Sequence, residues 1–262
     1  MIVKASSVEE AYELLNEHAS HTVLGGGVWL KRLPRKIEKA ITLDALNLDY
    51  IKAEAELVKI GSMTPLQSLV DSDLVQSLGS EILSKAINHV MGVGLRNLAT
   101  LGGSVVGRYG FSDIIPPLLA LDAKLVFHRK GEITLEKFLE TKGSVKDILI
   151  EVIVPRKKSV GYFKKVSNTP LDFSILNITI VKKEDSYCII LGSRPGGAVF
   201  ARKAMAFLGN KPLNTQNINE AVRLMEAEIS FGTNHSATAD YRHVLAKTYV
   251  RRGLEEVGNY ES

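Results

Sequence analysis

The chain has 262 residues, of which 45% are hydrophobic and 24% are charged, and its 33 basic and 29 acidic side chains give a formal net charge of +4. This length exceeds the roughly 100–200 residues of a typical domain, so we expect two domains or one divided domain. The composition excludes a disordered, collagen-like or coiled-coil chain. No apolar run reaches the roughly 18 residues that cross a bilayer and no signal-peptide pattern is present, so we expect a cytoplasmic protein with no membrane span.

The single cysteine, Cys188, excludes an internal disulfide, a Cys-rich zinc site and an iron–sulfur cluster held by this chain alone. Basic residues gather at 31–36 and at 156–165. Neither cluster is interleaved with the aromatic side chains that stack on bases, so we expect no nucleic-acid partner.

The first part of the chain alternates helical and extended patterns. Ser7 and Glu10 have capping-box spacing before an apolar stripe, which predicts a helix beginning at Val8. Short apolar runs predict strands at 22–24, 40–43 and 57–61. Thr64 and Pro65 are typical of the N-cap and first turn of another helix. This alternation favours an α/β or α+β unit.

The middle of the chain contains a predicted helix, a glycine-rich tract and a predicted strand. They lie at 80–90, 92–110 and 148–154, with buried runs at 118–121 and 124–127. Pro155 and the basic residues after it predict a domain boundary. The predicted domains are therefore 1–155, with subdomains of about 1–57 and 58–155, and 160–262.

The last hundred residues have a different pattern. Strand patterns at 175–181 and 187–191 flank a polar turn, which predicts a hairpin. Helical patterns follow at 200–208, 219–229 and 238–257. We expect a small sheet packed on a helical bundle.

Three glycines, Gly25, Gly26 and Gly27, directly follow the strand predicted at 22–24. Glycines let backbone N–H groups face a ligand without an intervening Cβ, and successive N–H groups form a concave nest that suits a phosphate. A simple tight turn is the alternative, because the spacing is not that of the dinucleotide fingerprint.

A second glycine pair, Gly102 and Gly103, is flanked by the hydroxyls of Thr100 and Ser104, which can donate to a phosphate oxygen. Two such loops can bind the two phosphates of a diphosphate from opposite sides. The lysine-containing motif of phosphoryl-transfer enzymes is absent, so that reaction has no support.

Other candidate sites are weaker. His18 and His21 have i, i+3 spacing but no third ligand in the sequence pattern, so we expect no metal site. The glycine pair in residues 193–197 follows a predicted strand and is interpreted as a turn. No carboxylate pair and no Ser-His-Asp order stands out, so we predict no catalytic residue.

The order of these motifs resembles the FAD-binding medium subunit of molybdenum hydroxylases, a family that includes the flavin subunit of carbon monoxide dehydrogenase and the flavin domain of xanthine dehydrogenase. The motifs are the Gly25 loop, Leu95-Arg96-Asn97, Thr100 to Ser104, Asp113 and residues 116–123. Residues 241–254 resemble the family's final helix, so the resemblance covers nearly the whole chain. It implies an α+β fold with a two-part FAD-binding domain, one part small and parallel α/β and the other a mixed or antiparallel sheet. A small three-stranded antiparallel sheet with a helical bundle follows.

The resemblance also implies the residues that bind FAD. One side of the diphosphate is assigned to Leu24, Gly25, Gly26, Gly27, Val28, Trp29 and Leu30, and the other to Thr100, Gly102, Gly103 and Ser104. Asp113 is the implied flavin-contacting aspartate, with a helix N-cap before Ile114 as the alternative. Leu149 and Lys164 match positions that flank the flavin, with core packing and a surface location as alternatives.

The first loop departs from the family pattern. Val28 and Trp29 stand where the family usually has a hydroxyl residue followed by a polar one, so a hydroxyl donor is lost. Backbone N–H groups supply most of such a site. Trp29 could stack on the cofactor, or pack against a partner subunit or the core.

The implied function is electron transfer in an oxidoreductase complex. By resemblance, a molybdenum cofactor in a large partner subunit oxidises the substrate, two [2Fe-2S] clusters in a small partner carry the electrons, and FAD in this chain passes them to NAD⁺, a quinone or another acceptor. Two alternatives remain open: a self-sufficient FAD oxidoreductase, and an assembly subunit of the same fold that has lost the flavin.

Overall fold

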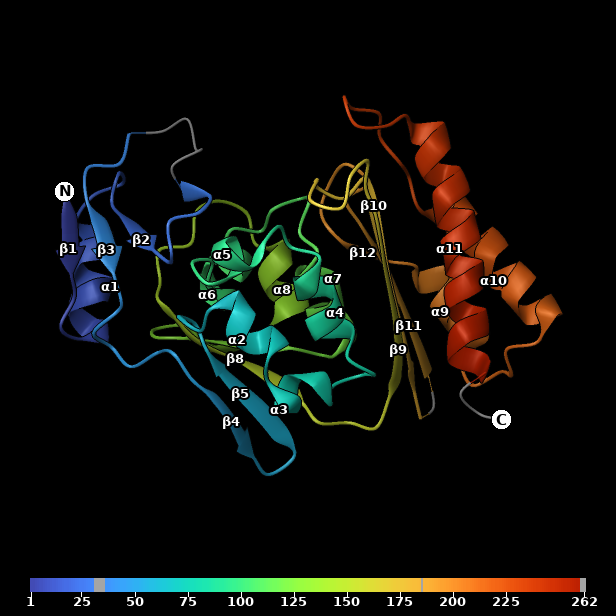
Figure 1. Cartoon of the computed structure of the whole chain (residues 1–262), viewed down its shortest axis with the longest axis horizontal. Helices are drawn as coiled ribbons and strands as arrows, with labels where there is room; N and C mark the ends of the chain where they lie inside the picture. Colours follow the sequence, from blue (N-terminus) through green and yellow to red (C-terminus); the bar gives the residue numbers. More distant parts are fainter. Residues whose placement is uncertain (31–35, 185, 260–262) are drawn as a thin grey trace. The chain divides into compact units, whose positions relative to one another are not determined.

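The computed structural model describes residues 1–30, 36–184 and 186–259 (Figure 1). Within these ranges the chain forms two compact units, each built from stretches that are far apart in the sequence. Unit 1 consists of Met1–Leu74, Gly92–Gly107 and Asp122–Pro155, and unit 2 of Val75–Met91, Arg108–Leu121 and Arg156–Ser262. The domain boundary after Pro155 stays a prediction.

Parts of two predicted features lie outside the described residues: Lys31 to Arg35 of the first basic cluster, and Asp185 of the predicted hairpin turn. Among the helices that are described, none combines the length and the apolar character that crossing a membrane requires.

Unit 1 begins with a small parallel sheet covered by one helix. The strands, in pairing order, are β1 (Ile2–Lys4), β3 (Ala40–Thr42) and β2 (Thr22–Leu24), and the helix is α1 (Val8–Glu17). The Ser7 hydroxyl accepts a hydrogen bond from the Glu10 backbone N–H at 3.1 Å, which confirms Ser7 as the N-cap. The Glu10 carboxylate accepts from the backbone N–H of Ser6. Leu15 of the helix and Ile41 of the central strand share one buried cluster.

The second sheet of unit 1 is antiparallel and has five strands. Its strands, in pairing order, are β4 (Ile51–Glu54), β5 (Leu57–Gly61), β8 (Leu149–Pro155), β6 (Lys124–Phe127) and β7 (Gly131–Thr134). The unit also contains the short helices α2 (Leu66–Val70), α5 (Val93–Arg96), α6 (Leu101–Val106) and α8 (Leu135–Glu140). The prediction that Thr64 caps a helix is wrong, because its hydroxyl pairs with the backbone of Tyr50 at 3.0 and 3.1 Å and Pro65 precedes α2 instead.

A four-stranded antiparallel sheet lies at the centre of unit 2. Its strands, in pairing order, are β12 (Val199–Phe200), β11 (Ser186–Gly192), β10 (Leu176–Lys183) and β9 (Val160–Val166). One face is covered by α4 (Ile82–Asn88) and α7 (Ile115–Ala120), and the other by α9 (Arg202–Leu208), α10 (Thr215–Glu228) and α11 (Ala239–Asn259) (Figure 1). The chain first passes from unit 1 to unit 2 within α3 (Asp73–Gln76).

The α+β class, the β10–β11 hairpin and the three C-terminal helices confirm the predictions. The sheet of unit 2 has one strand more than the three that the resemblance implies, because β12 pairs with β11. Phe200, expected to begin a helix, belongs to this short strand, and the helix begins at Arg202.

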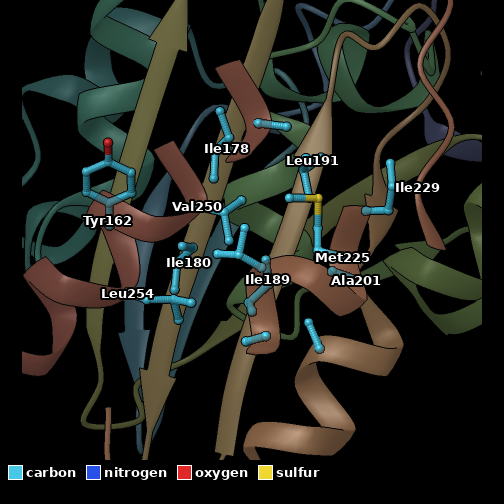
Figure 2. Packing of buried hydrophobic residues seen from close by; sticks show 14 of the residues in the cluster. Tyr162, Ile178, Ile180, Ile189, Leu191, Ala201, Met225, Ile229, Val250 and Leu254 are labelled. Atoms are coloured by element: carbon cyan, nitrogen blue, oxygen red, sulfur yellow. The ribbon is translucent and has the colours of Figure 1, made fainter. Parts of the chain in front are cut away.

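The apolar core of unit 2 lies between the sheet and the C-terminal helices (Figure 2). Ile180 of β10 belongs to the same buried cluster as Val250 and Leu254 of α11. The helix comes close to the sheet at Gly253, where a Cβ would lie 2.5 Å from the ring carbon Cδ1 of Tyr162. A glycine at this position therefore lets the helix backbone pack directly on the sheet.

The first turn of α11 is held by a buried arginine, Arg242, whose side chain is 1% exposed. Its guanidinium donates hydrogen bonds to the backbone oxygens of Ile175 at 2.9 Å, Gly232 at 2.6 Å and Ala237 at 2.6 Å, and to the side-chain oxygen of Asn234 at 2.6 Å. Arginine carries five N–H donors in a fixed planar arrangement, so one side chain satisfies all four acceptors.

We predict that Arg242→Met lowers the free energy of unfolding by about 3 kcal/mol, because it leaves one buried and three partly buried oxygens without donors, and an unpaired buried oxygen costs about 1–3 kcal/mol. Urea denaturation followed by circular dichroism measures the change. Arg251→Met on the same helix is the control, since its hydrogen bond to Asn219 is exposed, and it should cost less than about 1 kcal/mol. Equal losses in the two variants would contradict a special role for Arg242.

Candidate functional site

The two glycine loops lie against each other in unit 1. A Cβ on Gly26 would lie 1.7 Å from the carbonyl oxygen of Leu98, and one on Gly25 would lie 2.7 Å from the Thr100 hydroxyl oxygen. A Cβ on Gly103 would lie 3.1 Å from the Gly25 carbonyl oxygen. The absence of side chains at these positions therefore allows main-chain atoms of the two loops to meet.

The first loop leaves its backbone donors unused. Gly26 and Gly27 both have φ of +70°, a left-handed conformation that side chains other than glycine rarely adopt. Among the described residues, no protein acceptor pairs with the backbone N–H groups of Gly25, Gly26, Gly27 and Val28. Since backbone donors in folded proteins are nearly always satisfied by protein, water or ligand, these four N–H groups are available to water or to a bound ligand.

The second loop has already used most of its donors. The backbone N–H of Leu101 donates to Thr64 O at 2.9 Å and that of Gly102 to Ser62 O at 2.8 Å. The Thr100 hydroxyl accepts from Gly103 N–H at 3.2 Å, as the N-cap of α6. The second loop therefore supports the first one, and its glycines serve close packing.

The predicted hydroxyl donors of the second loop have different roles. Ser104 donates its hydroxyl to the carbonyl oxygen of Thr100 at 2.9 Å and is buried. The Thr100 hydroxyl accepts its capping bond through a lone pair, so its own hydrogen remains to be donated. Of the two hydroxyls, that of Thr100 is therefore the better placed to donate to an anion.

The remaining predicted residues of the first loop are partly buried. Leu24 ends β2, and its Cδ1 would lie 3.1 Å from a Cβ on Gly27. Val28, Trp29 and Leu30 continue the turn after the glycines and are half-buried.

Asp113 lies in unit 2, within a buried polar cluster. One carboxylate oxygen accepts hydrogen bonds from the Ser174 hydroxyl and, at 2.6 Å, from the Asn177 amide. The other lies 3.7 Å from the ammonium of Lys165, and both charged side chains are under one-tenth exposed. The alternative role of Asp113 as a helix N-cap is wrong, because Ile114 occupies the N-cap position of α7 and the Ser112 hydroxyl accepts from the N–H groups of Ile114 and Ile115.

Burial controls the protonation of this cluster. It raises the pKa of the Asp113 carboxyl, since a charge is costly away from water, and the bonds from Ser174, Lys165 and Asn177 oppose that rise. The pKa of His89 is lowered by burial and by the nearby Lys165 ammonium. Lys165 also donates to the His89 carbonyl oxygen at 3.0 Å, which fixes the cation beside the carboxylate.

Neighbouring residues of β9 face opposite sides of the sheet. Lys165 faces Asp113, whereas the ammonium of Lys164 lies 5.3 Å from the centre of the Tyr249 ring on α11. Successive side chains of a strand alternate between faces, so only one of the two lysines can reach the aspartate. Lys164, the lysine that the resemblance selects, lies on the face covered by the C-terminal helices.

The structure thus brings the two predicted loops together in unit 1 and leaves Asp113 and Lys164 apart within unit 2. Leu149, in unit 1, is the first residue of β8 and is buried. Lys165, Ser174 and Asn177 were not predicted from the sequence as partners of Asp113. Strand alternation through Lys164 and Lys165 could have identified the first of these, had β9 been recognised.

Comparison with protein families matches the chain in two parts. Residues 1–157 match the family described as the FAD binding domain in molybdopterin dehydrogenase, and residues 161–257 match the CO dehydrogenase flavoprotein C-terminal domain. Related proteins include the uncharacterized protein YgfM of Escherichia coli strain K12, which is 29% identical over 68% of this chain and 67% of its own length. The glyceraldehyde dehydrogenase medium chain of Sulfolobus acidocaldarius is 23% identical over 97% of each chain.

The fold matches that of solved structures. A chain of the carbon monoxide dehydrogenase from Hydrogenophaga pseudoflava superposes with a TM-score of 0.89 and 23% identity, covering 98% of this chain and 96% of the other. A likeness at this level of identity shows the shared fold.

We predict that stability depends on pH through Asp113. Its folded-state pKa is raised above the ordinary value of 3.8, so the native state holds this proton at pH values where the unfolded chain has released it. The contribution of Asp113 to stability is therefore greatest below pH 3.8 and falls as the pH rises through the folded-state pKa. Urea unfolding over this range should show the wild type losing stability relative to Asp113→Asn as pH rises. A relative gain instead would mean that Lys165 and the hydrogen bonds outweigh burial.

Proposed function

The chain belongs to the family of FAD-binding domains of molybdopterin dehydrogenases, and on this basis we propose that it passes electrons between iron–sulfur clusters of a partner subunit and an external acceptor. FAD is its cofactor, and the chain is a subunit of an oxidoreductase of the molybdenum hydroxylase family. The observation that most supports a working flavin site is the set of four unused backbone N–H groups at Gly25 to Val28.

The donors present fit the diphosphate of FAD. Backbone N–H groups bind phosphate oxygens without a charged side chain, and glycine leaves room for the anion to approach. We propose that the backbone N–H groups of Gly25 to Val28 bind the diphosphate and that Thr100 adds a hydroxyl donor. Gly102 and Gly103 allow the second loop to pack closely against the first. The hydroxyl that the family usually carries after the glycines is replaced here by Val28, and the backbone donors compensate for it.

When bound, FAD supplies the redox chemistry, and the protein has to bind, orient and tune it. Asp113 is proposed to contact the flavin, with Ser174, Asn177 and Lys165 holding its carboxylate in one orientation. Leu149 and Lys164 remain proposed neighbours of the cofactor.

The single cysteine supports an arrangement in which the iron–sulfur clusters lie in another subunit. Cys188 is the one cysteine of the sequence and is buried in β11. An iron–sulfur cluster needs several cysteine ligands, so any cluster must belong to another chain. The relative from Sulfolobus acidocaldarius is named a medium chain. We therefore propose a molybdenum-cofactor large subunit and a [2Fe-2S] small subunit as partners, a cytoplasmic location, and NAD⁺ or a quinone as acceptor.

We predict that Gly103→Asp abolishes FAD binding. The new Cβ would lie 3.1 Å from Gly25 O and 3.2 Å from the Thr100 hydroxyl, and the added carboxylate would repel the diphosphate. Two like charges about 4 Å apart at an effective dielectric constant near 20 repel by about 4 kcal/mol, so affinity should fall more than about 100-fold. The visible absorption spectrum of the purified protein measures bound flavin.

The control for this experiment is Gly94→Ala, because a Cβ there meets no atom within 4 Å. It should bind FAD like the wild type, and circular dichroism should show that both variants are folded. Normal flavin content in a folded Gly103→Asp variant would mean that the second loop is only a turn.

We also predict that the chain, tagged and isolated from its natural source, co-purifies with two other polypeptides, molybdenum and iron. The electrons should then reach FAD only in the complex, since the isolated chain contains FAD alone. Anaerobic spectra with candidate substrates test this. Purification of the chain without partners, together with flavin reduction by a small substrate, would favour a self-sufficient oxidoreductase. A chain that neither contains nor takes up FAD would be an assembly subunit.

A further inference from the structure

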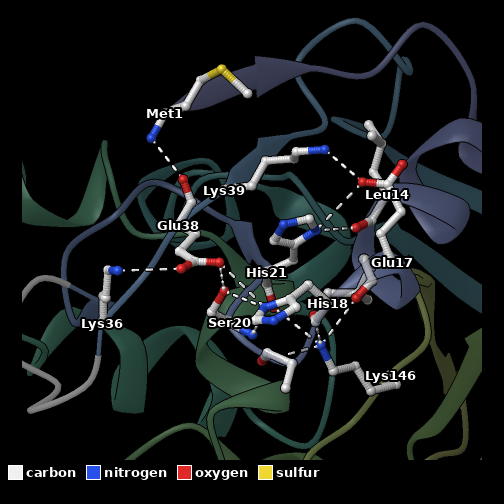
Figure 3. Close-up of polar contacts among 12 residues, drawn as sticks. Met1, Leu14, Glu17, His18, Ser20, His21, Lys36, Glu38, Lys39 and Lys146 are labelled. Carbon is white, nitrogen blue, oxygen red and sulfur yellow. Dashed lines mark hydrogen bonds and ion pairs between the residues drawn. The ribbon is translucent and has the colours of Figure 1, made fainter.

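Two histidines and a glutamate lie close together where strands β2 and β3 of the parallel sheet of unit 1 begin (Figure 3). His18 follows the end of α1, His21 immediately precedes β2, and Glu38 lies shortly before β3. One ligand atom from each of the three side chains lies within 4.8 Å of those of the other two. The sequence showed only the two histidines, and the pairing of β2 with β3 brings the carboxylate to them.

His21 is held in one orientation with one nitrogen free. Its side chain is 9% exposed, and its Nδ1 lies 2.7 Å from the carbonyl oxygen of Leu14. A carbonyl oxygen can only accept, so Nδ1 carries the proton and Nε2 carries the lone pair. A histidine that donates one N–H to a backbone carbonyl and presents its other nitrogen is the usual arrangement of a metal ligand.

His18 and Glu38 supply the other two atoms. The backbone N–H of Ser20 donates to Nδ1 of His18 at 3.2 Å and the Ser20 hydroxyl oxygen lies 2.7 Å from the same nitrogen, so a metal ion bound at Nδ1 takes the place of these two contacts. The same Nδ1 lies 3.3 Å from Oε2 of Glu38. Adjacent ligand atoms of a tetrahedral zinc ion with bonds near 2.0–2.1 Å are about 3.3 Å apart, so this pair already has the required spacing.

The backbone around these residues is fixed by hydrogen bonds. Thr22 N–H donates to Lys39 O at 3.0 Å, and Glu38 N–H to Ser20 O at 3.4 Å. The ammonium of Lys146 donates to the carbonyl oxygens of Leu15 and His18 at 3.0 Å, and to that of His21 at 3.3 Å. The three ligands therefore sit on segments that are tied together, and only the exposed side chains of His18 and Glu38 need to adjust.

The surrounding charges are mixed. Lys36 lies 3.3 Å from Oε1 of Glu38, leaving Oε2 to face the histidines, and Lys39 is paired with Glu17 at 2.6 Å. The Ser20 hydroxyl donates to Oε2 at 2.7 Å and so orients the carboxylate from outside. Two imidazoles and one carboxylate suit a borderline-soft divalent cation and do not suit Mg²⁺ or Ca²⁺, which prefer oxygen ligands.

We propose that His18 Nδ1, His21 Nε2 and Glu38 Oε2 bind one Zn²⁺ ion per chain, with water as the fourth ligand. The ion links the end of α1 to the starts of β2 and β3. Because β2 leads directly into Gly25, the metal stabilises the strand that carries the glycine loop, at the end of the strand away from it. This site is independent of the proposed electron-transfer function.

The test is a titration of chelator-treated protein with ZnCl₂ by isothermal calorimetry, followed by a Co²⁺ titration read by visible absorption. We expect one Zn²⁺ per chain and the intense bands of tetrahedral Co²⁺. His18→Asn and Glu38→Gln should each weaken Zn²⁺ binding more than about 100-fold, since loss of a direct ligand exceeds the 10–100-fold effect of an outer partner. Mg²⁺ should not bind.

His235→Asn is the matched control, because His235 is an exposed histidine far from these three residues in the sequence. It should bind Zn²⁺ like the wild type. Circular dichroism without metal should be the same for all variants, and their flavin content should not change. Zn²⁺ binding that is absent, or that survives unaltered in His18→Asn and Glu38→Gln, would overturn the proposal.

Discussion

Main-chain contact between two glycine loops is the constraint on which unit 1 depends. Gly26 lies where any side chain would collide with the carbonyl of Leu98, and Gly103 packs on the backbone of Gly25. The second loop uses its own N–H groups to hold this arrangement, through Ser62, Thr64 and Thr100. These contacts hold Gly26 and Gly27 in a left-handed conformation. Within the described part of the chain, the backbone N–H groups of the first loop have no protein acceptor. Glycine adopts this conformation without strain, and an anion that pairs with the loop's N–H groups would stabilise it.

Unit 2 contributes a different kind of preorganisation. Asp113 is buried with hydroxyl, amide and ammonium donors around it, so its carboxylate cannot rotate freely. Removal of Asp113 or of Lys165 alone would leave the other charge buried without its partner. This costs more stability than the loss of an exposed ion pair. Arg242 has a comparable structural role at the start of α11, where it satisfies carbonyl oxygens that the sheet and its connecting loops leave unpaired.

The sequence predicts the locally determined parts of the structure well. The helix after Ser7 and the hairpin of β10 and β11 follow from capping, periodicity and turn residues within a few positions. The glycine loops were also visible in the sequence, although a simple tight turn remained an alternative interpretation of the first one. The sequence could not indicate that the second loop supports the first. The contacts to Ser62 and Leu98 are made by backbone atoms, which every residue possesses.

Features that depend on distant pairing were missed for the same reason. The register of β9 decides that Lys165, and not Lys164, faces Asp113, and β9 itself lies in a basic stretch that does not read as a strand. Residues 75–91 and 108–121 belong to unit 2 through contacts with segments far along the chain, and the boundary after Pro155 stays a prediction. Likewise Glu38 reaches the two histidines only through the pairing of β2 and β3. Each case requires knowledge of strand partners that are separated in sequence.

The central claim is that the backbone N–H groups of Gly25 to Val28 bind the diphosphate of FAD. Amide nitrogen and proton chemical shifts of these four residues in the isotopically labelled chain test it most directly, measured with FAD and with riboflavin, which has no phosphate. Large changes at all four amides with FAD, and none with riboflavin, are the predicted result. Shifts that are the same for both ligands, or that leave these amides unaffected by FAD, would contradict the account.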